Sequence, residues 1–233
     1  MRVLTSGRVD AAAYGLTTTC NIYYIHLQVD EHAQIIRDLI SHIANSSWLK
    51  NLDPIIEHAY HARAVRTIPE MINKIKSGGT DKITSDSGEY IISYAAGKGL
   101  ELQFNHKRLP LAEMWKEKVL GNAGFDFHTE NQQNILIFGE SKYTSRGNPH
   151  NTALNQIIGF IEKNKDSSEL SDLKNFICNE TAQNCIAGNK GYAAAFSLRT
   201  NTPRETILYP IQNNPRISQL LQHQELYLIG VEI

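Results

Sequence analysis

The stretch Gly124–Lys142, GFDFHTENQQNILIFGESK, decides the fold that we predict for this chain. A short alternating run around Asp126 is followed by polar residues and then by the apolar run 135–138. Alternation, a polar turn and a second apolar run are the pattern of a β-hairpin. The second run has no polar face, which is typical of a strand buried on both sides. Charged groups at the end of such a strand are costly unless they are paired or bound to a metal.

Three charged side chains are predicted to meet at one end of this hairpin. Glu140 and Lys142 share a face because side chains alternate along a strand. A three-residue loop at 131–133 places Asp126 opposite Phe138, on that same face and one diagonal step from the pair. A two-residue turn would move Asp126 to the other face, so the prediction depends on register. Two carboxylates beside a lysine form the kind of oxygen-rich site that hard divalent cations favour.

Asp126 and the later residues 140–142 (ESK) resemble the D…(D/E)-x-K signature of the PD-(D/E)XK nuclease superfamily. The resemblance covers roughly residues 86–198. It implies a restriction-endonuclease-like fold, in which a helix, a mixed sheet with the motif, a second helix and a further strand follow in order. Phe125 departs from the family pattern, which has proline before the aspartate. Solvated charge at a strand end is the alternative explanation for the acid-x-lysine sequence.

The resemblance implies a role in phosphodiester hydrolysis for each motif residue. Asp126 and Glu140 hold one or two Mg²⁺ ions, with Mn²⁺ as a substitute, and a backbone carbonyl near Ser141 is a further ligand. The metal polarises the scissile phosphate and lowers the pKa of the attacking water. Lys142 orients that water or stabilises charge on the phosphate. Glu89, on the first helix of the core, matches an acid that many members direct to the metal. A place in the capping box of that helix, or a favourable interaction with the helix dipole, is its alternative role.

Several further residues are predicted to contact nucleic acid. Gln156 lies near the start of a predicted helix, where some members of the superfamily use glutamine, and a plain surface position is the alternative. A group of basic residues surrounds the motif: Lys107, Arg108, Lys116, Lys118, Lys142 and Arg146. Lys107, Arg108 and Arg146 are the predicted contacts among them, although composition alone favours an ordinary mix of solvated charges as the explanation of the group.

The net charge of −1 argues against tight binding of nucleic acid by the isolated chain. Neutralisation of phosphates supplies most of the affinity of nucleic-acid-binding proteins, which therefore carry a basic face. We accordingly expect a partner protein, or dimerisation, to deliver the nuclease to its substrate, with DNA preferred over RNA.

Within the superfamily, the residues around Glu89, Asp126 and Glu140 most resemble the nuclease subunits of bacterial phage-defence systems. The Hachiman type, in which the nuclease pairs with a helicase, is the one that we single out. This resemblance implies a helicase-like partner and an antiviral role. A stand-alone type II-like restriction endonuclease and a non-catalytic interaction module that retains the fold are the alternatives left open.

Composition sets the outer limits. With 233 residues and 41% hydrophobic content, the chain is long enough for one sizeable domain with a real core. No apolar run approaches about 18 residues, and residues 1–15 lack the pattern of a secretion signal, so we expect a cytoplasmic protein outside the membrane. Three cysteines are too few for a disulfide framework or a zinc site.

The interleaved patterns predict a mixed α/β or α+β fold in two regions. Residues 1–80 form an accessory or partner-binding region packed on the core, and residues 81–233 form the nuclease core, with the boundary at the glycine pair near residue 78. Expected in the first region are a strand at 18–29, a helix from Asp30 and a helix at 54–76 broken at Pro69. Expected helices of the core are 85–96, 111–120, 151–163, 168–185 and 215–222. Its expected strands, besides the hairpin, are 100–105, 191–198, 206–210 and 225–231.

Overall fold

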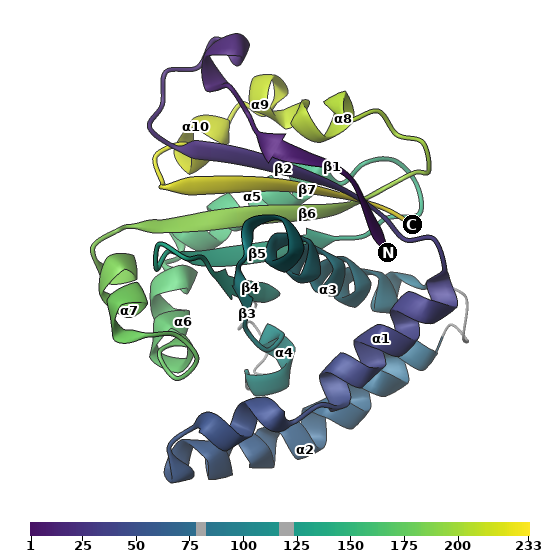
Figure 1. Ribbon diagram of the computed structural model, residues 1–233, viewed down its shortest axis with the longest axis vertical. Coiled ribbons are helices and arrows are strands. Elements are labelled where there is room, and N and C mark those ends of the chain that lie inside the picture. Colours follow the sequence, from purple (N-terminus) through teal and green to yellow (C-terminus); the bar gives the residue numbers. More distant parts are fainter. Residues whose placement is uncertain (78–82, 117–123) are drawn as a thin grey trace.

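The computed structural model describes residues 1–77, 83–116 and 124–233, and in this part the strands form one seven-stranded mixed sheet (Figure 1). The strands are β1 (Arg2–Arg8), β2 (Asn21–Gln28), β3 (Lys107–Arg108), β4 (Phe127–Glu130), β5 (Leu136–Lys142), β6 (Lys190–Leu198) and β7 (Glu225–Glu232). Their order across the sheet is β1-β2-β7-β6-β5-β4-β3. Neighbours from β2 to β5 pair in parallel, whereas β1, β4 and β3 pair antiparallel. The predicted mixed α/β class is confirmed.

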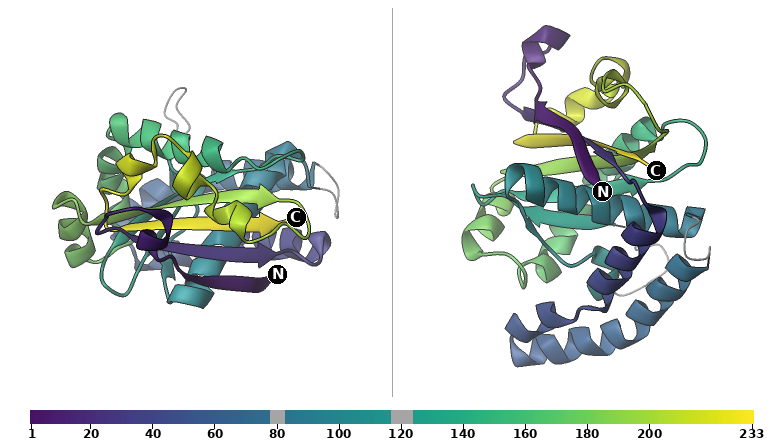
Figure 2. Two further views of the ribbon diagram at one scale, coloured as in Figure 1. Left: turned by 90° about the horizontal axis from the view of Figure 1, so that it is seen from above. Right: turned by 45° about the vertical axis from the view of Figure 1, so that its right-hand side comes forward.

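Helices cover both faces of the sheet. The helices are α1 (His32–Ala44), α2 (Pro54–Lys76), α3 (Ser85–Phe104), α4 (Ala112–Trp115), α5 (His150–Glu162), α6 (Lys165–Leu173), α7 (Asn179–Ile186), α8 (Glu205–Leu208), α9 (Pro210–Asn213) and α10 (Ile217–Leu220), with 3₁₀ turns η1 (Ala11–Tyr14) and η2 (Ser47–Asn51). Figure 1 shows α3 in front of the sheet and α5 behind it. Figure 2 shows α1 and α2 side by side, extending away from the sheet beyond α3.

The central strands are apolar on both faces because helices pack on each side. β6 carries the small residues 193–195 (AAA), all fully buried, at a point where both α3 and α5 contact the strand. Small side chains let the two helices approach the sheet closely. On the α5 face, Phe125 packs against Phe138 and Phe160 with ring centroids 5.1 Å apart in each case.

The two predicted regions share one sheet. β2 pairs in parallel with β7 along its whole length, from Asn21 opposite Glu225 to Gln28 opposite Glu232. The predicted boundary falls on residues 78–80, which lie outside the described residues. Pro69 was predicted to break a helix, and that prediction is wrong: Pro69 lies inside the continuous helix α2, which begins with Pro54 in its first turn.

A predicted strand at 100–105 is also wrong, because α3 continues through these residues and ends at Asn105 in the left-handed conformation. Gly97 and Gly99 lie just beyond the predicted end of the helix at residue 96, and glycine is a poor helix former. The glycines are instead sites of close packing: a Cβ on Gly99 would lie 3.0 Å from Cδ1 of Leu27 on β2. Contact with the sheet therefore outweighs the weak helix propensity.

Other elements differ from the prediction toward the C-terminus. The helix expected at 168–185 is two helices, α6 and α7, and the strand expected at 206–210 consists of α8 and the start of α9. Only α4 represents the helix expected at 111–120, and residues 117–120 lie outside the described ranges. β1 and β3 have no counterpart among the predicted elements. No helix in the described part of the chain has the length and apolar character needed to cross a membrane.

Candidate active site

The β4–β5 hairpin brings the two predicted acids together, although its register differs from the prediction. Phe127 lies opposite Gly139, a shift of two residues, so the connecting loop is 131–135 instead of 131–133. A shift of two residues leaves the alternation of faces unchanged. Asp126 therefore still lies beside Glu140, and its negative charge raises the pKa of Glu140.

The side chain of Asn131 explains the longer loop. Its Oδ1 accepts hydrogen bonds from the backbone N–H groups of Gln133 and Ile135, both at 2.9 Å. Asn134 adopts a positive φ of 57°, a conformation that asparagine tolerates better than most residues. A single side chain thus organises five residues into a compact turn.

Asp126 is tied to the backbone of β5 on both sides of Glu140. Its N–H donates to the carbonyl of Gly139 at 2.9 Å, and its Oδ2 accepts from the N–H of Ser141 at 2.8 Å. The aspartate is therefore held by the strand that carries the other acid.

Neither carboxylate oxygen of Glu140 has a hydrogen bond of good geometry among the described residues, and only Oε1 has an ion-pair partner. The side chain is 1% exposed, and the ammonium of Lys142 lies 2.8 Å from Oε1. No donor in the described part of the chain reaches Oε2. A buried carboxylate oxygen without a hydrogen bond is rare and destabilising in a folded protein. This oxygen is available to a cation.

Lys142 connects two carboxylates. Besides its contact with Glu140, its ammonium donates to Oε1 of Glu89 on α3 at 3.2 Å. The alternative capping role for Glu89 is wrong, because the capping box of α3 is formed by Thr84 and Ser87. Glu89 is 46% exposed, so it lies at the mouth of the site, while Glu140 lies inside.

Burial and mutual repulsion shift the pKa values of this group. Burial, together with the nearby charge of Glu89, raises the pKa of Asp126 to about 6 against the opposing effects of Lys142 and the Ser141 N–H. Burial and the charge of Asp126 raise the pKa of Glu140 well above its ordinary value. Burial alone would lower the pKa of Lys142, but the surrounding carboxylates outweigh it and raise that pKa. The lysine therefore stays charged at neutral pH.

Ser141 points the opposite way from its two neighbours. Its hydroxyl accepts a hydrogen bond of 2.9 Å from Ser93 on α3. Adjacent residues of a strand face opposite sides, so the hydroxyl faces α3 while the side chains of Glu140 and Lys142 leave the strand on the other side. Lys142 is the last residue of β5, and from there its long side chain still reaches Glu89 on α3. Only the backbone carbonyl of Ser141 remains as a ligand for a metal held by the two acids.

Gly88 on α3 allows the end of β5 to pack against this helix. A Cβ at this position would overlap Cβ and Cγ of Tyr143, the residue that follows Lys142. Gly159 on α5 offers a contrast, because nothing lies within 4 Å of an added Cβ there. The sequence places Gly88 beside Glu89 but contains no signal of the contact with Tyr143.

We expect Gly88→Ala to lower the free energy of unfolding by about 1–3 kcal/mol, because the added methyl overpacks the contact with Tyr143. The matched control Gly159→Ala should be neutral or stabilising by up to about 1 kcal/mol, since it only improves helix propensity. Urea denaturation of both variants measures the difference. Equal stability of the two would show that the Tyr143 ring moves aside freely.

The predicted nucleic-acid contacts are not all brought to the site. Lys107 pairs with Glu130 at 3.3 Å and Arg108 pairs with Glu101 at 2.9 Å, both from β3 at the edge of the sheet. Glu130 is four residues from Asp126 along the hairpin, roughly 13 Å at the usual rise of a strand.

The remaining predicted contacts lie after β5. Arg146 is exposed in the loop 143–149, which continues directly from Lys142. Gln156 is partly buried in the second turn of α5, and no hydrogen bond joins it to the acids in the described residues. Lys118 belongs to residues 117–123 and lies outside the described ranges.

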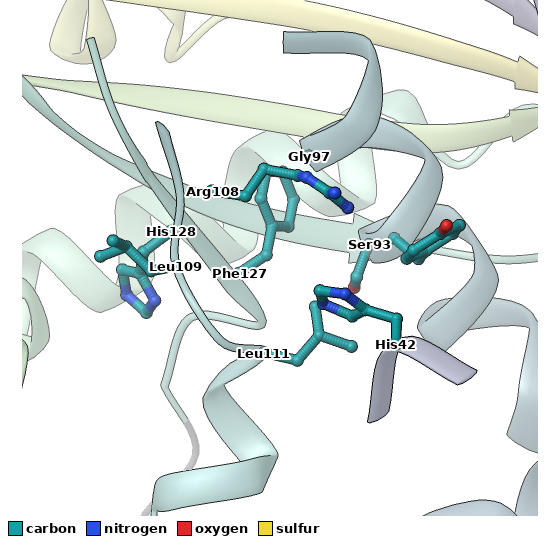
Figure 3. Close-up of a pocket in the computed structure, with 9 residues that line it drawn as sticks. His42, Ser93, Gly97, Arg108, Leu109, Leu111, Phe127 and His128 are labelled. Atoms are coloured by element: carbon teal, nitrogen blue, oxygen red, sulfur yellow. The ribbon is translucent and has the colours of Figure 1, made fainter. Parts of the chain in front are cut away.

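A small cavity between α1, α3 and the β3–β4 edge is separate from this site (Figure 3). Its volume is about 10 Å³, enough for roughly one water molecule. The guanidinium of Arg108 lies over it, close to Gly97, and Ser93 and His42 face it from two helices. The cavity is too small for a substrate and lies on the α3 face, opposite to Glu140.

Sequence reasoning missed the residues that support Asp126 from outside the hairpin. Glu169 on α6 accepts a hydrogen bond from the N–H of Phe125, 44 residues away. Nε2 of His128 donates to the other oxygen of Glu169 at 2.9 Å. No local pattern marks Glu169, because its partners come from other elements.

Metal ligation at this site rests on few protein groups. The described residues contain no set of three or more His, Cys, Asp and Glu side chains arranged to hold a metal ion. The candidate ligands are therefore two carboxylates and one backbone carbonyl, from Asp126, Glu140 and Ser141.

Neither the models of known protein families nor the curated proteins match this chain.

Proposed function

We propose that this protein is a metal-dependent nuclease that hydrolyses phosphodiester bonds, with DNA preferred over RNA. One observation carries the proposal: the buried carboxylate of Glu140 has an oxygen without a donor and lies beside Asp126 and Lys142. Two acids with raised pKa values next to a charged lysine are typical of a functional site. A purely structural ion pair would satisfy its buried oxygens with donors.

The residues present fit a magnesium ion. Mg²⁺ is commonly held by one or two carboxylates and completes its octahedron with waters and substrate phosphate oxygens. Asp126 and Glu140, with the carbonyl of Ser141, would supply such a set, so a third acid is not required. When bound, Mg²⁺ or Mn²⁺ polarises the scissile phosphate and lowers the pKa of the attacking water.

The chain's own residues have distinct roles in this proposal. Lys142 carries its positive charge at neutral pH, so it stabilises negative charge on the phosphate and does not act as a general base. Glu89 contacts the Lys142 ammonium from the exposed side and orients it toward an incoming strand. Glu140 holds the same ammonium from the buried side.

The order of elements supports a restriction-endonuclease-like core. α3, the β4–β5 hairpin, α5 and β6 occur in this order as a helix, the motif strands, a second helix and a further strand, with β3 and α4 before the hairpin and α6 and α7 before β6. The same order is implied by the resemblance of Asp126 and residues 140–142 to the PD-(D/E)XK signature. We propose this fold family on these two observations together.

We propose further that a partner, helicase-like as in the resembling phage-defence systems, brings the nuclease to its substrate. The net charge is −1, and Lys107 and Arg108 are already neutralised by Glu130 and Glu101. A basic residue that is already paired with a carboxylate contributes less binding free energy when it contacts a phosphate. The isolated chain should therefore bind DNA weakly.

The purified chain, incubated with plasmid DNA or RNA and Mg²⁺ or Mn²⁺, should cleave the nucleic acid, and a chelator should stop the reaction. Calorimetric titration should show Mn²⁺ binding that is lost in Asp126→Asn. A chain that neither binds the metal nor cleaves with any of these substrates contradicts the proposal. Metal-independent formation of a stable partner complex, without cleavage by that complex, would favour the interaction module instead.

A further inference from the structure

A buried hydrogen-bond network lies directly behind Asp126. Glu169 on α6 is 7% exposed. Its Oε1 accepts from the Lys116 ammonium at 2.6 Å and from the N–H of Phe125 at 3.0 Å. Its Oε2 accepts from Nε2 of His128 at 2.9 Å. Both oxygens of this acid are therefore satisfied, in contrast to those of Glu140.

The network holds the backbone on which Asp126 stands. Lys116 also donates to the carbonyl of Phe125 at 2.6 Å, so both backbone groups of Phe125 are bonded to side chains. β4 begins only at Phe127, so the sheet ladder does not hold Phe125. Side chains from α6 and from Lys116 take the place of a neighbouring strand at this point.

The close approach of Glu169 depends on a glycine. A Cβ on Gly124 would overlap Oε1 of Glu169. Trp115 and Phe125 pack on His128 with ring centroids 5.9 and 6.3 Å away, which fixes the third member of the network. The position of Phe125 is therefore determined by packing and hydrogen bonds together.

We infer that Glu169 is a positioning residue, which sets the place of the Asp126 carboxylate by fixing Phe125 and thereby tunes metal affinity. This inference rests on the proposed function. Displacement of a catalytic ligand by about 1 Å commonly reduces activity about 100-fold, so the support of such a ligand matters as much as its identity.

The same helix offers a matched control. Asp166 is also buried, at 2% exposure, and pairs with the Lys190 ammonium at 2.5 Å and the Tyr192 hydroxyl at 2.7 Å. Lys190 lies opposite Leu136, at the far end of β5 from Lys142 and roughly 20 Å away along the strand. Asp166→Asn therefore disturbs a buried ion pair but leaves both backbone hydrogen bonds of Phe125 in place, and Asp166 reaches Phe125 only through ring packing of Tyr192, with centroids 6.0 Å apart.

The test compares Glu169→Gln with Asp166→Asn in metal-dependent cleavage and in calorimetric metal titration at pH 8. Both variants should lose thermal stability. Only Glu169→Gln should raise the half-saturating Mg²⁺ concentration, by about tenfold or more, while Asp166→Asn stays within about twofold of the wild type. An unchanged Mg²⁺ requirement in Glu169→Gln would overturn the inference, whereas a wild-type chain without metal binding would overturn the proposed function itself.

A second variant, Lys116→Met, distinguishes an effect of the network on the position of Asp126 from a direct effect of the Lys116 charge on metal binding. It also replaces Glu169→Gln as the test if that variant does not fold. Removing a nearby positive charge should by itself strengthen cation binding. Loss of the hydrogen bond to the Phe125 carbonyl should instead weaken cation binding, because Asp126 is then displaced. We expect metal affinity to fall several-fold, and a rise in affinity would show that Lys116 acts only through its charge.

Discussion

Glu140→Gln is expected to abolish metal-dependent cleavage and, in the absence of metal, to make the protein more stable. The loss of activity should be at least about 1,000-fold, equivalent to about 4 kcal/mol, because glutamine is a poor substitute for a carboxylate that binds a hard cation. The gain in stability follows from the removal of a buried charge whose Oε2 has no donor and whose neighbour Asp126 repels it.

The size of the gain is open to measurement by thermal unfolding with a chelator at pH 8. We expect a melting temperature roughly 3 °C or more above that of the wild type, since each kcal/mol is worth about 2–4 °C in a chain of this size. Unchanged or lower stability would mean that the charge of Glu140 is compensated by Lys142 alone.

Glu232 provides the matched control for this variant. It is 2% exposed, like Glu140, but His26 and the N–H of Thr202 contact its Oε1 at 3.0 and 3.1 Å, and Gln28 donates to its Oε2 at 3.0 Å. Glu232→Gln replaces an acceptor that has donors at both oxygens, so it should lower the free energy of unfolding by about 1–3 kcal/mol. Opposite signs of the change in unfolding free energy for Glu140→Gln and Glu232→Gln would show that the charge of Glu140 destabilises the fold and serves a function instead.

Lys142→Met should also abolish cleavage, but it should destabilise the protein. The substitution removes the one cation that contacts Glu140 among the described residues, and it leaves Asp126 with only the Ser141 N–H and the more distant charge of Lys116 to stabilise its carboxylate. Removing one partner of a buried ion pair costs about 3–5 kcal/mol, and the lower value applies here because Lys142 is 15% exposed. Lys107→Met, at a side chain that is 58% exposed, should change stability by less than about 1 kcal/mol.

The destabilisation of Lys142→Met should depend on pH in a defined direction. The pKa of Asp126 is raised from 3.8 to about 6 in the folded protein, so the folded state binds a proton more tightly than the unfolded state. The contribution of Asp126 to stability therefore falls as pH rises from about 4 through about 6 and stays low above that range. Without the lysine, the repulsion between the acids grows with pH.

Urea unfolding of Lys142→Met at pH 5 and pH 8 measures this effect. The difference in stability from the wild type should be small at pH 5, where Asp126 carries a proton, and large at pH 8. A difference independent of pH would attribute the loss to packing of the lysine stem and not to its charge.

The hairpin shows which features of the site were predictable from local sequence. Asp126 and Ser141 are only 15 residues apart, and the alternation of side chains along two short strands was enough to place both acids on one face. The loop length was not predictable, because it depends on hydrogen bonds from the Asn131 side chain. The error of two residues was harmless since the period of a strand is two.

Helix and strand assignments failed where packing outweighed propensity. The first core helix was predicted to end at residue 96, before Gly97 and Gly99, yet α3 packs against β2 and continues to Phe104. Pro69 suggested a break in α2, which continues to Lys76. Compared with alanine, glycine inside a helix costs about 1 kcal/mol and proline about 3 kcal/mol. Burial of the apolar face of a whole helix stabilises the fold by more than these amounts.

The sequence by itself determined the mixed α/β class and the meeting of two acids and a lysine at a strand end, because side-chain periodicity is a local property. Only the tertiary structure decided that Glu89 joins Lys142 across 53 residues, that Glu169 supports Phe125 across 44, and that β2 joins β7 to complete the sheet. These contacts depend on which faces bury one another when the whole chain folds, and periodicity within one segment does not specify its partner.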